Sequence, residues 1–154
     1  MTDFALEIER FDPVWDRIVS EAKSVLDVEP LLGAMIHSSI LHHSSLDQAL
    51  AYRISLKLAS AEMPEQMLRE VTDQAYLEGQ IGLHSRADLV AVLERDPSCH
   101  RLIQPILYFK GFHAVQAYRV SHWLWNKGRK DLSYFFQSRI SEVFGIDIHP
   151  AAVI

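Results

Sequence analysis

The chain has 154 residues, of which 49% are apolar and 23% are charged, and its formal net charge is −5. This is the composition of an ordinary globular domain with a buried core. The acidic balance argues against a nucleic-acid-binding surface, and the lack of any run of 18 apolar residues argues against a membrane span.

Proline and capping signals divide the first half of the chain into helices. The dipeptide DP at 12–13 opens the first helix, since proline is tolerated in the first turn, and apolar residues then recur at three- and four-residue steps. EP at 29–30 ends that pattern and starts a second helix, whose apolar positions continue to Leu41. SLDQ at 45–48 has the form of a capping box and predicts a helix through Leu58.

Similar signals continue through the second half. MPE at 63–65 starts a helix that ends near Gly79, and SRAD at 85–88 resembles a second capping box. The helix opened there ends at DP 96–97, because the residue before proline avoids the helical region. Three more helices are expected, from 98 towards 110, from 112 to 125 and from 131 to 144. About eight helices with short connections predict one all-α unit.

Residues 145–154, GIDIHPAAVI, do not continue the helical pattern. Helical spacing is lost after Gly145, and Pro150 forbids a continuing helix. Ile148 and Ile154 are six residues apart, with the small Ala152 between them. A period of six with an aliphatic and a small residue is typical of a hexapeptide-repeat β-helix, and an extended tail is the alternative.

Several motifs occur in an order that points to a family. One stretch reads LYFKGFHAVQAYRVSHWLWNKGRK and is followed by FGIDIHPAAVI. This stretch closely resembles bacterial and plant serine acetyltransferases. The earlier stretches EAKSVLDVEPLL, ALAYRISLKL, MPEQMLREV and ERDPSC agree with it. The resemblance covers residues 13–154. It implies an all-α N-terminal domain, residues 1–144, followed at 145–154 by the first strand of a left-handed parallel β-helix.

The family resemblance also implies an activity. Its members transfer an acetyl group from acetyl-CoA to the hydroxyl of L-serine, which gives O-acetylserine for cysteine biosynthesis. No cofactor is held permanently, and acetyl-CoA, the co-substrate, binds mostly to β-helix residues beyond residue 154. The catalytic histidine belongs to a DHATG-like segment that the 154 residues do not contain. We therefore expect this chain to be the N-terminal portion of a longer enzyme and to be inactive alone.

Two carboxylates match functional positions of the family. By resemblance, Asp147 of the DIHPAA motif orients the histidine base, as a carboxylate does in a catalytic triad. Without the motif, an Asp just after a helix-ending glycine is more often a turn or capping residue. Asp96 matches the substrate-binding carboxylate, which would meet the ammonium group of serine. Its alternative role is the N-cap of a helix that begins at Pro97.

The histidines and the aromatic residues near the C-terminus are expected to have structural roles. No metal site is expected, because the eight histidines show neither HExxH nor Cys/His spacing. His113 and His122 are expected to pack or form hydrogen bonds. Four aromatic residues are expected to be core or subunit contacts that cover the junction between the helical domain and the β-helix: Trp123, Trp125, Phe135 and Phe136.

Partners and location follow from the resemblance and the composition. The family implies a hexamer, in which β-helices form trimers and helical domains join two trimers, and docking to O-acetylserine sulfhydrylase through a C-terminal tail. The acidic N-terminus does not resemble a secretory signal, and a single cysteine, Cys99, fits a cytoplasmic protein. The alternative function is an all-α oligomerisation domain without catalysis.

Overall fold

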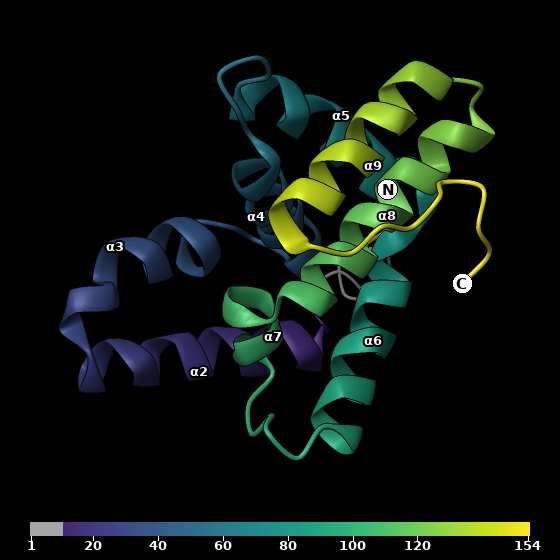
Figure 1. Ribbon diagram of the computed structural model, residues 1–154. Coiled ribbons are helices and arrows are strands. Elements are labelled where there is room, and N and C mark those ends of the chain that lie inside the picture. Colours follow the sequence, from purple (N-terminus) through teal and green to yellow (C-terminus); the bar gives the residue numbers. More distant parts are fainter. Residues whose placement is uncertain (1–10) are drawn as a thin grey trace, which may run out of the picture.

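The computed structural model describes residues 11–154, so the N-terminal stretch interpreted above lies outside the described residues. Eight α-helices and two short helical turns make up this part, and it contains no strand. In chain order they are α2 (Pro13–Val28), η1 (Pro30–Leu32), α3 (Gly33–Ile36), η2 (His37–Leu41), α4 (Leu46–Leu58), α5 (Glu65–Gly79), α6 (Ile81–Arg95), α7 (Ile103–Tyr108), α8 (Lys110–Asn126) and α9 (Lys130–Phe144). The prediction of an all-α unit is confirmed (Figure 1).

Local signals placed most helix starts correctly. Asp12 caps α2, where its carboxylate accepts a hydrogen bond from the Trp15 N–H at 3.2 Å. Ser45 caps α4, where its hydroxyl accepts from the Gln48 N–H at 3.3 Å. The Gln48 side chain accepts from Ser44, however, and not from the Ser45 N–H, so only one of the two capping-box bonds forms.

Three predicted elements differ from the structure. The second helix is divided into a 3₁₀ turn, one α-turn and the π-turn η2, in which the His42 N–H reaches back to the His37 carbonyl. The capping box at Ser85 is wrong: α6 begins at Ile81, directly after Gln80 in a left-handed conformation. The helix expected from 98 is confined to α7, because residues 96–102 form turns.

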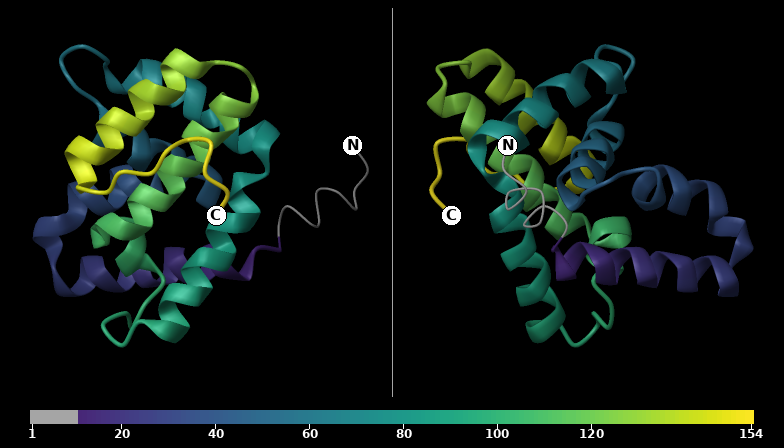
Figure 2. Two further views of the ribbon diagram at one scale, coloured as in Figure 1. Left: turned by 45° about the vertical axis from the view of Figure 1, so that its right-hand side comes forward. Right: turned by 180° about the vertical axis from the view of Figure 1, so that it is seen from behind.

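Helix α8 lies at the centre of the molecule and contacts α4, α5, α6, α7 and α9. Small residues on α8, Ala114 and Ala117, are fully buried and allow the neighbouring helices to approach closely. One core joins all these helices, and its largest fully buried side chains include Tyr118, Phe136 and Leu50. The part from α2 to η2 projects to one side, as the two opposite views show (Figure 1 and the right view of Figure 2).

The last ten residues cross the α8–α9 pair without helical structure and turn at 149–152, where the Ala152 N–H donates to the His149 carbonyl at 2.9 Å (Figure 1). Gly145 ends α9 in the left-handed region, with φ 70°, as predicted from its position. Pro150 is buried against the helices. The assignment of residues 145–154 to the start of a β-helix stays a prediction. None of the described helices is long and apolar enough to cross a membrane.

Candidate functional site

Asp96 ends α6 and turns the chain away from it. Its backbone N–H donates to the Val92 carbonyl at 2.9 Å, and its Oδ1 accepts from the Ser98 N–H at 2.9 Å and the Ser98 hydroxyl at 2.7 Å. These bonds to Ser98 hold the pKa of the Asp96 carboxyl below its usual value. Because no helix begins at Pro97, the alternative role as an N-cap is wrong, and Asp96 forms an Asx-type turn.

A surface hollow of about 340 Å³ opens beside Asp96. Its lining combines the Asp96 carboxylate and Ser98 with apolar surface from Val92, Phe109 and Phe112. Among the described residues, Asp96 Oδ2 accepts no hydrogen bond, so one carboxylate oxygen is available to a ligand. An anionic group beside apolar walls is suited to a small molecule with an ammonium group.

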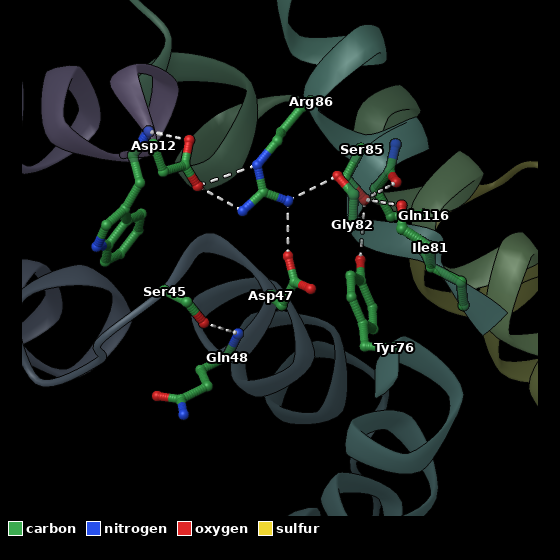
Figure 3. A network of polar contacts seen from close by, with 11 residues as sticks. Asp12, Ser45, Asp47, Gln48, Tyr76, Ile81, Gly82, Ser85, Arg86 and Gln116 are labelled. Carbon is green, nitrogen blue, oxygen red and sulfur yellow. Dashed lines mark hydrogen bonds and ion pairs between the residues drawn. The ribbon is translucent and has the colours of Figure 1, made fainter. Parts of the chain in front are cut away.

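The start of α6 is fixed by Arg86, which joins three helices (Figure 3). Its guanidinium donates to Asp12 at 2.5 and 3.0 Å, to Asp47 at 2.8 Å and to the Gly82 carbonyl at 2.9 Å. Burial opposes ionisation of Asp12, but the bonds from Arg86 and the Trp15 N–H outweigh it and lower the pKa of Asp12. The guanidinium thus ties α6 to the N-terminal ends of α2 and α4.

The middle of α6 is tied to α5 and α8 by a second group of polar side chains. The Ser85 hydroxyl lies 3.3 Å from the Tyr76 hydroxyl and donates to Gln116 Oε1 at 2.7 Å (Figure 3). Gln116 in turn donates to Asp88 at 2.7 Å, and Asp88 forms an ion pair with Arg119 at 2.7 Å. Both networks anchor the first half of α6, the helix that ends at Asp96.

Asp147 lies three residues after the end of α9 and is exposed. Its Oδ1 accepts a hydrogen bond from Gln137 Nε2 at 2.9 Å. Both residues line a hollow of about 390 Å³ with Tyr134, Ser138, Ser141 and Glu142. This hollow shares no lining residue with the one beside Asp96, so the chain carries its two candidate carboxylates at separate places.

A stripe of side chains on α8 holds the segment that contains Asp147. The Tyr118 hydroxyl donates to the Ala152 carbonyl, and His122 Nδ1 lies 2.7 Å from the Pro150 carbonyl. Trp125 packs against His149, with ring centroids 5.1 Å apart. Residues 118, 122 and 125 share one helix face, and they contact residues 152, 150 and 149, so the segment runs antiparallel to α8.

Sequence reasoning missed this stripe in part. The expected hydrogen bond of His122 is confirmed. Trp125 contacts His149 of the terminal segment, while its place at a junction with a β-helix stays a prediction. Phe136 lies in the core, one of the two places expected for it, and is 1% exposed. Tyr118 was not singled out, although its spacing from His122 and Trp125 was a usable signal.

His113 and Cys99, the remaining titratable and nucleophilic candidates, are both buried. His113 is buried and lies 2.6 Å from the Ile106 carbonyl, and burial lowers its pKa to about 4. Cys99 is also buried, and burial raises the pKa of its thiol. Within residues 11–154, no group of three or more His, Cys, Asp or Glu side chains is arranged to hold a metal ion.

Comparison with known proteins identifies the family. Residues 14–117 match the family model described as "Serine acetyltransferase, N-terminal". The chain belongs to the serine acetyltransferase family. It is 46% identical over 147 residues to a serine acetyltransferase of Salmonella typhimurium, an alignment that covers 95% of this chain and 54% of the relative. The chain thus spans about half the length of the curated relatives that it matches.

Solved structures of family members share the fold. A Neisseria gonorrhoeae serine acetyltransferase in complex with serine is 48% identical, with a TM-score of 0.87, over 92% of this chain and 58% of that one. A Brucella abortus serine acetyltransferase in complex with coenzyme A is 39% identical, with a TM-score of 0.91, over 96% of this chain and 59% of that one. A further serine acetyltransferase, in complex with cysteine, is 45% identical, with a TM-score of 0.89, over 92% of this chain and 59% of that one.

Proposed function

We propose that this chain acts in serine O-acetyltransfer, as the helical part of an enzyme that acetylates the hydroxyl of L-serine from acetyl-CoA. The product is O-acetylserine, for cysteine biosynthesis. The observation that carries the proposal is the 48% identity, at a TM-score of 0.87, to a serine acetyltransferase crystallised with serine. The relative crystallised with coenzyme A supports acetyl-CoA as the co-substrate, with no permanently bound cofactor.

The proposed chemistry needs a base for the serine hydroxyl. A histidine accepts that proton as the hydroxyl oxygen attacks the thioester carbonyl, and it returns the proton to the departing CoA sulfur. We assign Asp147 the part of the carboxylate that fixes the tautomer of this histidine and stabilises its imidazolium form. Support comes from the match to the DIHPAA motif and from the anchoring of that segment by α8 and α9.

Asp96 is proposed to bind the ammonium group of serine. Its Oδ1 is held by Ser98, and its Oδ2 is available for a charge-assisted hydrogen bond. In this proposal the two carboxylates belong to different active sites of the assembly, and each site would lie between neighbouring subunits, as the family resemblance implies. Their separate hollows within one chain are consistent with that arrangement.

The rest of the proposal concerns organisation. Residues 1–144 form the helical domain, and residues 145–154 begin a left-handed β-helix built of hexapeptide repeats. The assembly is a hexamer in which helical domains join two trimers, in the cytoplasm, with O-acetylserine sulfhydrylase as a partner of the C-terminal tail. The exposed apolar side chains Val28 and Leu31, 76% and 92% accessible, support a contact between helical domains.

That apolar patch is also the observation in favour of the alternative, an oligomerisation domain without catalysis. Sedimentation of the 154-residue chain across a range of concentrations tests the contact, and we expect dimers. A strict monomer at high micromolar concentration would show that the helices do not pair alone. A stable trimer would show that trimer contacts also lie in this domain.

A chimera tests the activity itself. Residues 1–154 are joined to the part of the Salmonella typhimurium relative that follows its matched region, and thiol release from acetyl-CoA is measured with and without serine. We expect serine-dependent turnover by the chimera, and none approaching one per second, within the ordinary enzyme range, by the 154-residue chain. A folded, oligomeric chimera without serine-dependent turnover would reject the proposed function.

In the chimera, Asp147→Asn should lower kcat by on the order of 10²–10⁴-fold while the fold is kept, because the orienting charge is lost. The matched control is Asp73→Asn, which removes an exposed carboxylate paired with Arg69. An unchanged kcat would remove Asp147 from the mechanism.

Asp96→Ala should raise the KM for serine far more than the KM for acetyl-CoA, because only serine carries an ammonium group. The two constants are measured by varying each substrate in turn at saturating levels of the other. An equal rise in both would instead indicate that Asp96 serves only the turn at the end of α6.

A further inference from the structure

Gln137 on α9 is placed beside the proposed orienting carboxylate. Its Nε2 donates to Asp147 Oδ1 at 2.9 Å, and within residues 11–154 it is the side chain that donates to this carboxylate. The two residues line the same hollow. The neutral amide thereby occupies Oδ1, and among the described residues no donor bonds to Oδ2 of Asp147.

The backbone around Asp147 is already held on both sides. Before it, the Gly145 N–H donates to the Ser141 carbonyl at 2.9 Å and ends α9. After it, His122 Nδ1 lies 2.7 Å from the Pro150 carbonyl. Between these two anchors, the bond from Gln137 restricts the rotation of the Asp147 side chain about its two torsions.

We propose that Gln137 is a positioning residue for acetyl transfer, which acts by turning the free oxygen of Asp147 toward the histidine base. This inference rests on the proposed function. An amide is suited to the task because it donates a hydrogen bond without adding charge. A lysine or arginine at this place would offset the negative charge that stabilises the imidazolium, and a glutamate would repel the carboxylate.

The chimera with Gln137→Leu tests the proposal. We expect kcat to fall about tenfold, equivalent to ~1.4 kcal/mol, with the KM of each substrate unchanged within about twofold. Gln137→Glu keeps the size of the side chain and should lower kcat at least as much. The matched control is Gln74→Leu, which removes an exposed amide that donates to Glu78 at 3.1 Å on α5.

A double-mutant cycle separates positioning from a general structural effect. If Gln137 acts through Asp147, then Gln137→Leu lowers kcat no further once Asp147→Asn is present. An additional tenfold loss in that background would overturn the proposal, as would full kcat in Gln137→Leu alone.

A measurement without catalysis keeps this inference separate from the proposed function. In the 154-residue chain, Asp147→Asn should shift the side-chain amide NMR signals of Gln137 and leave those of Gln74 in place. Unmoved Gln137 signals would overturn the pairing, whatever the activity. Moved signals together with a folded but inactive chimera would uphold the pairing and reject both the proposed function and a catalytic use of the pair.

Discussion

Gly82 offers a sharp test of how α6 is anchored, because a methyl group there would collide with Asp47. A Cβ built on Gly82 would lie 2.5 Å from Asp47 Oδ2 and 2.6 Å from Asp47 Cγ. The carboxylate would have to rotate away and would lose its 2.8 Å contact with Arg86 (Figure 3). Gly82→Ala therefore has two opposite effects on stability: alanine increases the helix propensity, and the ion pair between Asp47 and Arg86 is lost.

The gain in helix propensity is opposed by two costs, each of a similar size to the gain. Alanine favours a helix interior by about 1 kcal/mol over glycine. The contact between Arg86 and Asp47 is partly exposed, with side-chain exposures of 25% and 38%, so its loss costs about 1 kcal/mol after solvent screening. A displaced Asp47 rotamer adds on the order of 1 kcal/mol. We expect Gly82→Ala to lower the free energy of unfolding by about 1 kcal/mol in total.

The sign should reverse when the obstacle is removed. In an Asp47→Ala background the methyl group meets no carboxylate, and Gly82→Ala should raise the free energy of unfolding by about 1 kcal/mol. Urea unfolding of the four chains, followed by far-UV circular dichroism, yields a coupling free energy of about 2 kcal/mol. If Gly82→Ala stabilises the chain with Asp47 intact, the close approach of α4 and α6 is not as described.

Two further predictions concern stability. The pKa of His113 is lowered from 6.5 to about 4 in the folded chain, so the unfolded chain binds more protons between these values. The free energy of unfolding should then fall as the pH drops from 6.5 to 4, by up to about 3 kcal/mol, and urea titrations of His113→Phe should lose this pH dependence. Arg139 donates to the Leu58 and Ala59 carbonyls at 2.9 and 3.0 Å, at the end of α4. Arg139→Met should lower the free energy of unfolding in urea by about 1–2 kcal/mol. Glu142→Gln removes the charge of the 69% exposed ion-pair partner of Arg139 and should lower it by less than about 0.5 kcal/mol. Equal effects would contradict the capping role of Arg139.

Helix boundaries that depend on covalent geometry were predictable from the sequence. Pro13 and Pro64 mark the starts of α2 and α5, because the proline ring restricts the backbone at that residue. Gly145 marks the end of α9, because a residue without Cβ can adopt the left-handed conformation. The motif around Asp147 was equally readable, since its residues are consecutive. These features need no knowledge of distant parts of the chain.

Ser85 shows where local reasoning stopped being sufficient. A Ser followed three residues later by Asp occurs at helix starts and inside helices alike. Here the Ser85 hydroxyl lies inside α6, where it contacts Gln116 Oε1 on α8 at 2.7 Å and the Ile81 carbonyl of its own helix at 3.1 Å, and it caps no backbone N–H. The start of α6 was decided by the left-handed turn at Gln80 and by packing against α8. Tertiary contacts overruled a local pattern whose free energy is only about 1 kcal/mol.

The surroundings of the two carboxylates also depend on the tertiary structure. Motifs of consecutive residues made Asp96 and Asp147 candidates, but the partners of the Asp147 segment come from elsewhere in the chain. Gln137 is 10 residues before Asp147, and His122 is 28 residues before Pro150. A hydrogen bond needs its donor and acceptor within about 3 Å of each other, and only the packing of α9 on α8, with the last ten residues across both, brings these atoms to that distance.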